Sequence, residues 1–293
     1  MRRGNQARRC TIRAGNEPLR ETFIELEPGA RVTEGEIVLR EDRRGAAWLT
    51  LNRPRQLNTL SKAMIEALQA HLDAIERDPA VRVVVIAAAG SAFCPGHDLK
   101  EMRAMRDEEA LRALFRQCSR MMMTLRRLPP PVIARVHGLA TAAGCQLVAM
   151  CDLVVAAESA TFAVSGINVG LFCSTPGVAL SRQIDRKHAL EMLFTGDFVD
   201  APTAERRGLV NRVVPAERLD EEVERLAASI VAKSPAAVAS GKRLFYEQVE
   251  LGIEAAYERA AEVMARDMIS EDAGEGIDAF LEKRAPQWKG RPS

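Results

Sequence analysis

Apolar and polar positions alternate along this chain in two ways, and the switch between them predicts the order of strands and helices. Runs that are apolar at nearly every position, as at 81–88, 132–136 and 153–156, predict strands buried on both faces. Stretches with an apolar residue at every third or fourth position predict amphipathic helices, as at 62–77 behind an N-cap at Ser61. The two patterns alternate through most of the chain, and helical patterns alone follow.

Further elements complete this order. Strands are predicted at 37–39 and 46–51 around a turn at 43–45, and at 161–164 and 209–214. Helices are predicted from Asp98, where Glu101 would complete a capping box, between Pro202 and Gly208, and at 108–127, 142–150, 178–183, 187–194, 217–232, 235–249, 253–270 and 274–283. Strands that alternate with helices, followed by helices alone, predict an α/β core with a helical tail.

Three regions are therefore expected: a flexible, arginine-rich N-terminal arm (1–35), an α/β core (36–233) and a C-terminal helical oligomerisation region (234–293). The last region carries more apolar surface than a free helical tail could expose to water. These apolar residues are Leu244, Phe245, Val249, Ile253, Tyr257, Val263, Met264, Met268 and Ile269. The tail is expected either to fold back on the core or to pack on another subunit, and the sequence leaves both open.

Composition excludes several classes of protein. Lys and Arg number 41 against 40 Asp and Glu, and aromatic residues are only 4%, so neither a basic nor a base-stacking nucleic-acid surface is indicated. The six cysteines include no Cys-x-x-Cys pair, and the four histidines are scattered. The cysteines are therefore expected to be small buried apolar residues in a reducing compartment, without a zinc site.

The sequence gives two indications about location. No run reaches the roughly 20 apolar residues of a membrane helix, so no membrane association is expected. The arm resembles a transit peptide in composition but lacks a clear amphipathic stripe. Arginine far outnumbers lysine, which indicates a GC-rich, bacterial genome. A cytoplasmic protein is predicted, with a mitochondrial one as the alternative.

Candidate chemistry lies in two short stretches, Phe-Cys-Pro-Gly-His-Asp-Leu at 93–99 and Gly-Leu-Ala-Thr-Ala-Ala-Gly-Cys-Gln at 138–146. Each follows an apolar run and turns tightly into a helix. Two such turns can aim backbone N–H groups at one carbonyl oxygen and stabilise it as it becomes negative. Neither a dinucleotide fingerprint nor a nucleotide-binding P-loop motif is present.

Several motifs in a fixed order resemble the enoyl-CoA hydratase/isomerase family, also called the crotonase superfamily, from about 37 to 288. They lie at 51–54 with 57–58, 93–102, 131–152, 192–196, 204–214 and 280–284. The resemblance implies a spiral of strand–strand–helix units and a homotrimer or dimer of trimers. It also implies an acyl-CoA thioester as ligand, with coenzyme A as part of the substrate and no separate cofactor.

The resemblance also assigns roles to particular residues. The backbone N–H groups of His97 and Ala143 would form an oxyanion hole for the thioester carbonyl. Residues expected to contact the substrate or its coenzyme A moiety are Arg55, Leu57, Asp98, Leu99, Lys100, Gly144, Gly166, Phe280 and Lys283, of which the three cations would meet phosphates.

Two positions depart from the family pattern. Hydratases of this family carry two glutamates that hold water and move protons, and the matching positions here are Gln146 and Gly166. A glutamine can hydrogen-bond water but cannot take its proton, and a glycine has no side chain. General acid–base catalysis contributes about 10²–10⁴-fold, so efficient hydration of an enoyl-CoA is not expected.

Other side chains leave alternatives open. The His97 ring could act as a base or only pack beside the ligand, and Asp98 could be catalytic or a helix N-cap. Cys173 and Ser174 could act as nucleophiles, although no base is close in sequence. The function is thus expected to be enolate stabilisation with little acid–base help, as in a slow hydratase, a decarboxylase or a hydrolase. A non-catalytic acyl-CoA binder is the alternative, and a serine hydrolase using Ser174 is a third class.

Overall fold

A six-stranded sheet forms the centre of the protein in the computed structural model, which describes residues 35–290. Its strands, in spatial order, are β1 (Val38–Arg43), β2 (Ala46–Leu51), β3 (Val83–Ala88), β5 (Val132–Val136), β7 (Leu153–Ala157) and β10 (Arg212–Val214). All neighbours are parallel except β1 and β2, which form a hairpin. The predicted N-terminal arm lies outside the described residues apart from its last position.

A second sheet of four very short strands lies beyond the first. It contains β4 (Ala92–Cys94), β6 (Leu139–Thr141), β8 (Thr161–Ala163) and β9 (Val199–Asp200), in that order. Each of β3, β5 and β7 continues through a turn into β4, β6 or β8 of this sheet, and helices follow. The chain therefore repeats a strand–strand–helix unit. Only β8 of this sheet was predicted, because strands of two or three residues are too short to show a period.

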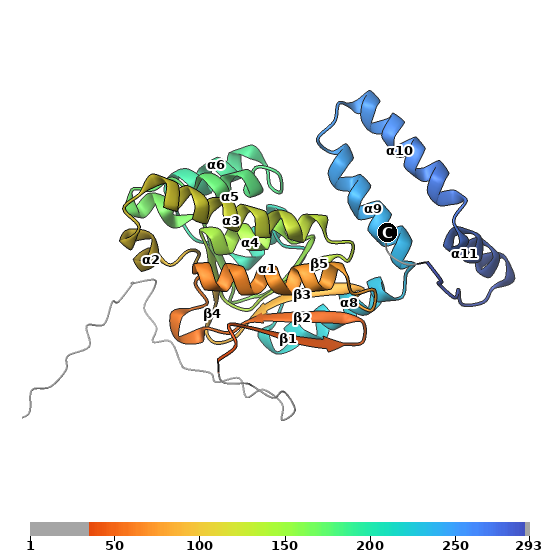
Figure 1. Cartoon of the computed structure of the whole chain (residues 1–293), viewed down its shortest axis with the longest axis horizontal. Coiled ribbons are helices and arrows are strands. Elements are labelled where there is room, and N and C mark those ends of the chain that lie inside the picture. Colours follow the sequence, from red (N-terminus) through yellow and green to blue (C-terminus); the bar gives the residue numbers. More distant parts are fainter. Residues whose placement is uncertain (1–34, 291–293) are drawn as a thin grey trace, which may run out of the picture. The chain divides into compact units, whose positions relative to one another are not determined.

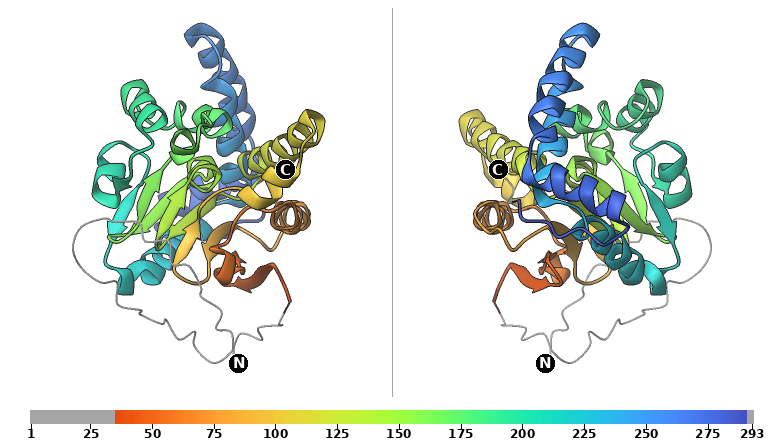
Figure 2. Two further views of the ribbon diagram at one scale, coloured as in Figure 1. Left: turned by 90° about the vertical axis from the view of Figure 1, so that its left-hand side faces the viewer. Right: turned by 90° about the vertical axis from the view of Figure 1, so that its right-hand side faces the viewer.

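Helices cover both faces of the first sheet (Figures 1 and 2). In β3, Val84 and Ile86 belong to the cluster with α1 (Lys62–Glu76) and α3 (Glu108–Arg127), whereas Val83 and Val85 pack with α8 (Leu219–Val231). Alternate side chains of a strand point to opposite faces, so a strand between two helical layers must be apolar throughout. This explains the unbroken apolar run predicted as a buried strand.

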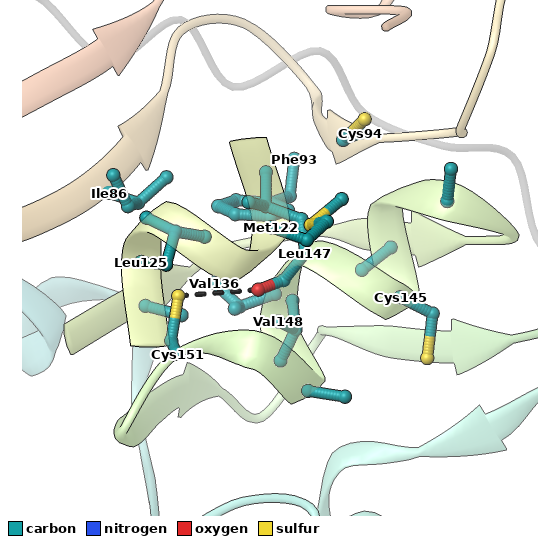
Figure 3. Close-up of a cluster of buried hydrophobic side chains, with 14 of the residues drawn as sticks. Ile86, Phe93, Cys94, Met122, Leu125, Val136, Cys145, Leu147, Val148 and Cys151 are labelled. Atoms are coloured by element: carbon teal, nitrogen blue, oxygen red, sulfur yellow. Dashed lines mark hydrogen bonds between the residues drawn. The ribbon is translucent and has the colours of Figure 1, made fainter. Parts of the chain in front are cut away.

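The larger core cluster, between the two sheets and α3, includes α4 (Ala143–Met150) (Figure 3). All five cysteines among the described residues are free thiols and buried, as predicted. Cys151, for example, donates a hydrogen bond from Sγ to the carbonyl oxygen of Leu147 at 3.3 Å. These cysteines fill space in the core, and burial raises the pKa of Cys94, Cys118 and Cys145 to about 12.

The remaining helices of the α/β part are short. They are α2 (Leu99–Ala104), α5 (Ser174–Leu180), α6 (Arg186–Thr195) and α7 (Ala201–Arg206). The helix predicted at 178–183 begins four residues earlier, because Pro176 fits the first turn of a helix. The strand predicted at 209–214 begins only at Arg212. The N–H groups of Leu209 and Val210 instead donate to the carbonyl oxygen of Ala204, at 2.9 and 3.4 Å, and close α7.

The capping box predicted at the start of α2 is half correct. Asp98 is the N-cap, and its Oδ1 accepts hydrogen bonds from the N–H groups of Lys100 (2.8 Å) and Glu101 (3.1 Å). The Glu101 carboxylate does not turn back to Asp98. Its Oε2 instead accepts the N–H of Lys62, the first residue of α1, at 3.0 Å. Glu101 therefore satisfies an orphan donor of α1 and ties that helix to α2.

Three helices form the C-terminal region: α9 (Pro235–Gln248), α10 (Ile253–Met268) and α11 (Glu271–Glu282). α9 is fixed to the core by a buried ion pair in which Lys242 Nζ lies 2.6 Å from Asp152 Oδ2. Asp152 Oδ1 also accepts a hydrogen bond from the Tyr246 hydroxyl at 2.7 Å. The first helix of the predicted tail thus folds back on the core.

α10 packs along α9 (Figure 1) and buries Ala256 and Val263. Beside this buried face α10 carries an exposed apolar row, Ile253, Tyr257, Met264 and Met268, and Met264 is 76% exposed. This row follows helical spacing, so it forms one stripe. No helix within 35–290 is long and apolar enough to span a bilayer.

Candidate functional site

The two predicted turns meet at Gly96. This residue lies between β4 and α2 with φ of +98°, in the left-handed region that favours glycine. A Cβ atom added to it would lie 2.9 Å from Ala142 Cβ and 3.0 Å from the backbone nitrogen of Ala143. A side chain at position 96 would therefore separate the turns. Its absence brings the peptide between Gly96 and His97 next to the first turn of α4.

A second glycine fixes the other side of this contact. Gly144, the second residue of α4, lies so close to β4 that an added Cβ would be only 2.0 Å from the Cys94 carbonyl oxygen. The strands that precede the two turns, β4 and β6, are neighbours in the second sheet. Sheet pairing and close packing at Gly144 therefore hold the two turns in one arrangement.

The start of α4 leaves backbone donors free. Its N-cap, Ala142, has φ of +50°, provides no side-chain cap and donates its own N–H to the Ala163 carbonyl oxygen at 3.0 Å. Within residues 35–290, no acceptor is found for the N–H of Ala143 or for that of His97. Orphan donors at a helix start are the groups that can hold an oxyanion. The predicted pair of donors is therefore available.

The His97 ring is held as a neutral group. It packs edge-on to the Phe115 ring of α3, with centroids 5.5 Å apart, and burial lowers its pKa to about 4. Its Nε2 is buried and has no hydrogen-bond partner among the described residues. The neighbouring Asp98 is occupied as the N-cap of α2, which favours the structural interpretation of this carboxylate over a catalytic one.

Gln146 lies one helical turn after Ala143. It is 5% exposed, and its Oε1 is buried without a partner in the described part of the chain. Side chains of a helix lean toward its N-terminus, and residues three apart share a face. Gln146 and Ala143 therefore lie on one face of α4. No ionisable side chain of α4 accompanies it, because the helix contains none other than Cys145.

Gly166 lies in a short 3₁₀ helix, η2 (Ser165–Val169). A Cβ at this position would lie 2.6 Å from the Leu171 carbonyl oxygen and 2.7 Å from Cys173 Sγ. The loop after η2 thus fills the space that a side chain would need. A hydrogen bond of 2.8 Å between the hydroxyls of Thr141 and Ser165 holds η2 to β6, beside the second turn.

The two candidate nucleophiles lack a base. Cys173 is mostly buried, and burial raises the pKa of its thiol. The Ser174 hydroxyl donates weakly to the Phe172 carbonyl oxygen at 3.4 Å. In the described structure neither side chain has a hydrogen bond to a histidine or a carboxylate. A thiol with a raised pKa and an unactivated hydroxyl are poor nucleophiles.

Four of the residues expected to contact coenzyme A come together at the first turn. The segment before α1 runs beside Gly96 and His97, because the Leu60 N–H donates to the Gly96 carbonyl oxygen at 2.8 Å. The structure thereby places η1 (Pro54–Gln56) and the start of α2 on the same side. The residues gathered there, all exposed, are Arg55, Leu57, Leu99 and Lys100.

Asn58 positions this segment, a role that the sequence analysis did not assign. It is fully buried with φ of +61°, and its Nδ2 donates to the carbonyl oxygens of Ala89 (2.8 Å) and Ala92 (2.9 Å). Its Oδ1 accepts the Arg53 N–H at 2.8 Å. The signal in the sequence was an asparagine in the segment between the second predicted strand and the first predicted helix, because asparagine tolerates a positive φ.

Phe280 and Lys283 are not brought to this place within one chain. They lie at the end of α11, where Phe280 is 82% exposed. The contacts of this region that are described run to the junction of α8 and α9. Asp272 accepts the Ser234 hydroxyl, and the Trp288 ring nitrogen donates to the Ala232 carbonyl oxygen at 2.8 Å.

Comparison with known proteins gives the family. Residues 41–291 match the family model described as enoyl-CoA hydratase/isomerase. This chain belongs to the enoyl-CoA hydratase/isomerase family. The motif-based resemblance is therefore confirmed, and the family membership covers nearly the whole described chain.

Individual relatives extend this result. A crystal structure of an enoyl-CoA hydratase from Mycobacterium smegmatis is 58% identical, with a TM-score of 0.85, and covers 86% of this chain and 98% of that one. Enoyl-CoA hydratase domain-containing protein 3, mitochondrial, from Xenopus laevis is 47% identical over 83% of each chain. The crystal structure of the human protein of that name is 44% identical, with a TM-score of 0.84, over 86% and 100% of the two chains.

The predicted fold of the family, a spiral of strand–strand–helix units with a helical C-terminal region, is confirmed by these structures. This enoyl-CoA hydratase/isomerase family member lacks both glutamates of the family pattern, and at Gly166 the structure gives a steric reason. The backbone of Leu171 and the thiol of Cys173 leave no room for a side chain at Gly166.

Proposed function

We propose that this protein binds an acyl-CoA thioester, with the thioester oxygen between the backbone N–H groups of His97 and Ala143. The observation that carries the proposal is the contact of the two turns at Gly96, where an added Cβ would lie 3.0 Å from the Ala143 nitrogen. Each fixed donor in a site of this kind lowers the free energy of an oxyanion by about 3–4 kcal/mol. The site would therefore stabilise an enolate or a tetrahedral intermediate.

The reaction that this site favours needs little protein acid–base catalysis. Gln146 cannot accept a proton, and the packing around Gly166 leaves no space for a carboxylate. The neutral His97 ring belongs to the first turn, and its pKa of about 4 makes it a weak base. A slow hydratase, a decarboxylase or a hydrolase fits these residues, and an efficient hydratase does not.

Coenzyme A would lie over the exposed side of the first turn. The cations Arg55 and Lys100 would meet its phosphates, and Leu57 and Leu99 offer apolar contact. Asp98 and Gly144 shape the two turns, and no cofactor besides coenzyme A is needed. Phe280 and Lys283 would complete the site from a neighbouring copy in a homotrimer or a dimer of trimers, since α11 lies away from α2 in one chain (Figure 1).

A non-catalytic acyl-CoA binder is the second candidate. It is favoured by one observation, that neither Cys173 nor Ser174 has a base within hydrogen-bonding distance among the described residues. Binding needs only the two N–H donors and the cations. Turnover needs a proton carrier that the site does not contain, unless the substrate or solvent supplies it.

The cellular location is proposed from the relatives. The names of the Xenopus laevis and human proteins include the word mitochondrial, which supports the mitochondrial alternative. The cytoplasmic location stays a prediction.

The binding proposal is tested by two glycine variants. Gly96→Ala should weaken the binding of butyryl-CoA at least tenfold, measured by isothermal titration calorimetry, because its Cβ would push the two turns apart. Gly208→Ala is the matched control: its φ is also positive, at +83°, but its Cβ would meet only an ordinary contact at 3.7 Å. Equal affinity of both folded variants would exclude the oxyanion hole as the binding site.

Catalysis is tested separately with crotonyl-CoA, by following the loss of enone absorbance at high protein concentration beside an active hydratase. Turnover near that of the control would mean that another group replaces both glutamates. If the protein binds butyryl-CoA but does not turn over crotonyl-CoA, the remaining candidate functions are binding alone, decarboxylation and hydrolysis. Release of carbon dioxide from a malonyl-type thioester would then indicate a decarboxylase, release of free thiol a hydrolase, and neither a binder.

A further inference from the structure

Helix α11 has little apolar packing to hold it in place. All twelve of its residues are described, and only Asp272 and Ala279 are buried among them. Its large apolar side chains, Ile277, Phe280 and Leu281, are exposed. A helix with so few buried apolar contacts opens easily unless other interactions fix it. In this structure those interactions are polar, and several of them meet at Asp272.

The Asp272 carboxylate joins three parts of the chain. It is 4% exposed, and its Oδ2 accepts the hydroxyl of Ser234, the N-cap of α9. Its Oδ1 accepts the backbone N–H groups of Lys289 and Gly290, at 2.8 and 2.9 Å. A buried carboxylate needs several donors of this kind to offset its lost hydration. Asp272 therefore binds the start of α11 both to α9 and to the residues that follow α11.

The residues after α11 form a strap, residues 284–290, that runs back along the helix. Near its start, Arg284 forms a two-pronged pair with the Glu275 carboxylate, with nitrogen–oxygen distances of 2.6 and 3.0 Å. Near its end, the Trp288 ring nitrogen donates to the Ala232 carbonyl oxygen at 2.8 Å. The strap therefore holds one face of α11 and fastens it to the junction of α8 and α9.

Lys283 lies between the helix and the strap. It is the C-cap of α11, with φ of +56° in the left-handed region, and its N–H donates to carbonyl oxygens of the last turn. Arg284 follows it directly, so the pair with Glu275 fixes Lys283 from the side of the strap. Asp272 fixes it from the side of the helix. The positions of Lys283 and of Phe280, one turn earlier, are therefore set within the chain that carries them.

We propose that Asp272 is a positioning residue for the acyl-CoA site: it holds α11 and the strap so that Lys283 and Phe280 are preset to meet the coenzyme A bound by another copy of the chain. This inference rests on the proposed acyl-CoA site and adds a residue that acts on it without touching the ligand. Groups on an ordered helix lose less conformational freedom when they bind, and this raises affinity. A buried carboxylate of one subunit thus controls the affinity of the next.

The test measures the affinity for butyryl-CoA by isothermal titration calorimetry. Asp272→Ala removes the acceptor and should weaken binding about five- to tenfold, because a partly exposed cation–phosphate contact and an apolar contact are lost. Asp272→Asn can still accept both N–H groups of the strap through its amide oxygen, so it should keep most of the affinity. Asp278→Ala, at an exposed carboxylate of the same helix, is the matched control and should bind as the unmodified protein does.

A double variant shows whether the carboxylate acts through α11. Lys283→Ala should weaken binding by itself, and its effect combined with that of Asp272→Ala should be smaller than the sum of the two. A residue that only stabilised the fold would lower the free energy of unfolding and leave the affinity of the folded protein unchanged. Additive effects, or an Asp272→Asn variant as weak as Asp272→Ala, would overturn the inference.

Gly290→Ala tests the same contact from the strap and replaces Asp272→Ala if that variant fails to fold. Its Cβ would lie 2.7 Å from Asp272 Oδ2, so it should displace the strap and weaken binding in the same way. Gly274→Ala on α11, where a Cβ meets nothing within 4 Å, is its control. Unchanged affinity in the folded strap variants, or in Lys283→Ala, would overturn the inference and leave the acyl-CoA site in place. Failure of the unmodified protein to bind butyryl-CoA would instead reject the proposed function, and this inference with it.

Discussion

Single residues decide which chemistry this site can support, and Gly166 shows how. The absence of a side chain there is not an empty space, since Leu171 and Cys173 occupy the volume that a Cβ would need. The sequence alone shows that a glutamate is missing. It cannot show that the position is closed, because the atoms that close it come from five and seven residues later in a loop without periodicity.

We expect Gly166→Ala to lower the free energy of unfolding by about 1–3 kcal/mol, since even a methyl group overpacks this position. Adding Cys173→Ala should restore part of the loss by removing one of the two close atoms. Chemical denaturation measures both effects. Gly241→Ala in α9, where a Cβ meets nothing within 4 Å, should instead be neutral or stabilising by up to about 1 kcal/mol. Equal effects at the two glycines would contradict the packing at Gly166.

The His97 ring predicts a pH dependence of stability. Its pKa is lowered from 6.5 to about 4 in the folded protein, so between these values the unfolded state binds a proton that the folded state does not. Stability should therefore fall as the pH falls from 6.5 toward 4, by at most about 3 kcal/mol, and this group should contribute no slope above 6.5.

Denaturation at several pH values would show this slope, and His97→Gln, which keeps the backbone N–H, should reduce it. His71→Gln on α1 is the control, because it removes a histidine outside the two turns, and a loss of slope specific to the His97 variant supports the assignment. A slope that is the same with and without the His97 ring would assign the acid sensitivity to other groups.

At the scale of elements, the ion pair that fixes α9 matters most. Lys242 and Asp152 have side chains 7% and 14% exposed, and Lys242 Nζ also donates to the carbonyl oxygens of Leu125 (2.9 Å) and Pro130 (3.1 Å). One ammonium group thus joins α9 to the end of α3 and to the turn before β5. A second contact comes from Arg126, whose guanidinium lies 4.3 Å from the centroid of the Tyr246 ring.

Lys242→Met should destabilise the protein by about 3–5 kcal/mol, because it leaves the Asp152 carboxylate buried without its cation. The double variant with Asp152→Leu should be less destabilised than the sum of the single changes. Arg218→Met, which breaks an exposed pair with Glu221, should change stability by less than about 1 kcal/mol. Thermal or chemical unfolding provides the comparison, and additive effects at 152 and 242 would contradict direct coupling.

Prediction from sequence worked best for long elements and failed for short ones. The apolar stripe of α1 and the unbroken apolar run of β3 gave their positions to within two residues. β4, β6 and β9 were missed, although β4 and β6 lead into the oxyanion turns. The Glu101 side chain was predicted to cap the start of its own helix, α2, but it caps the start of α1. Its partner Lys62 is 39 residues away, and no local pattern reveals such a contact.

For the whole molecule, the exposed apolar stripe of α10 carries the prediction of an oligomer. The composition of the tail indicated that its apolar residues are buried either on the core or against another subunit. In the structure, α9 contacts the core and the apolar row of α10 does not. α9 is fixed to the core through Lys242 and Tyr246, whereas its Phe245 remains exposed, as do Ile253, Tyr257, Met264 and Met268 of α10 in the single chain. The position of α11 could not be derived from the sequence either, since helical periodicity does not define which surface a helix meets.

We expect Met264→Lys to reduce the mass of the particle in solution, because a charge would be buried in a contact between subunits. Sedimentation velocity or light scattering after gel filtration measures the mass. Glu258→Lys, which introduces the same residue at an exposed polar position of α10, should leave the mass unchanged. A monomer in the unmodified protein, or no change in the Met264 variant, would argue against an interface on this stripe.

The pairing of Asp152 with Lys242 also has a consequence for the order of events during synthesis. The ribosome makes the carboxylate 90 residues before its ammonium partner (242 − 152), about 5–18 seconds earlier at 5–20 residues per second. Throughout that interval the strands β1 to β6 and both turns of the site have been synthesised, yet the Asp152 carboxylate lacks its cation. Nascent chains released before residue 242 should therefore be digested by protease, and chains that extend past Tyr246 should resist it. The last sixth of the coding sequence thus determines whether the earlier part survives.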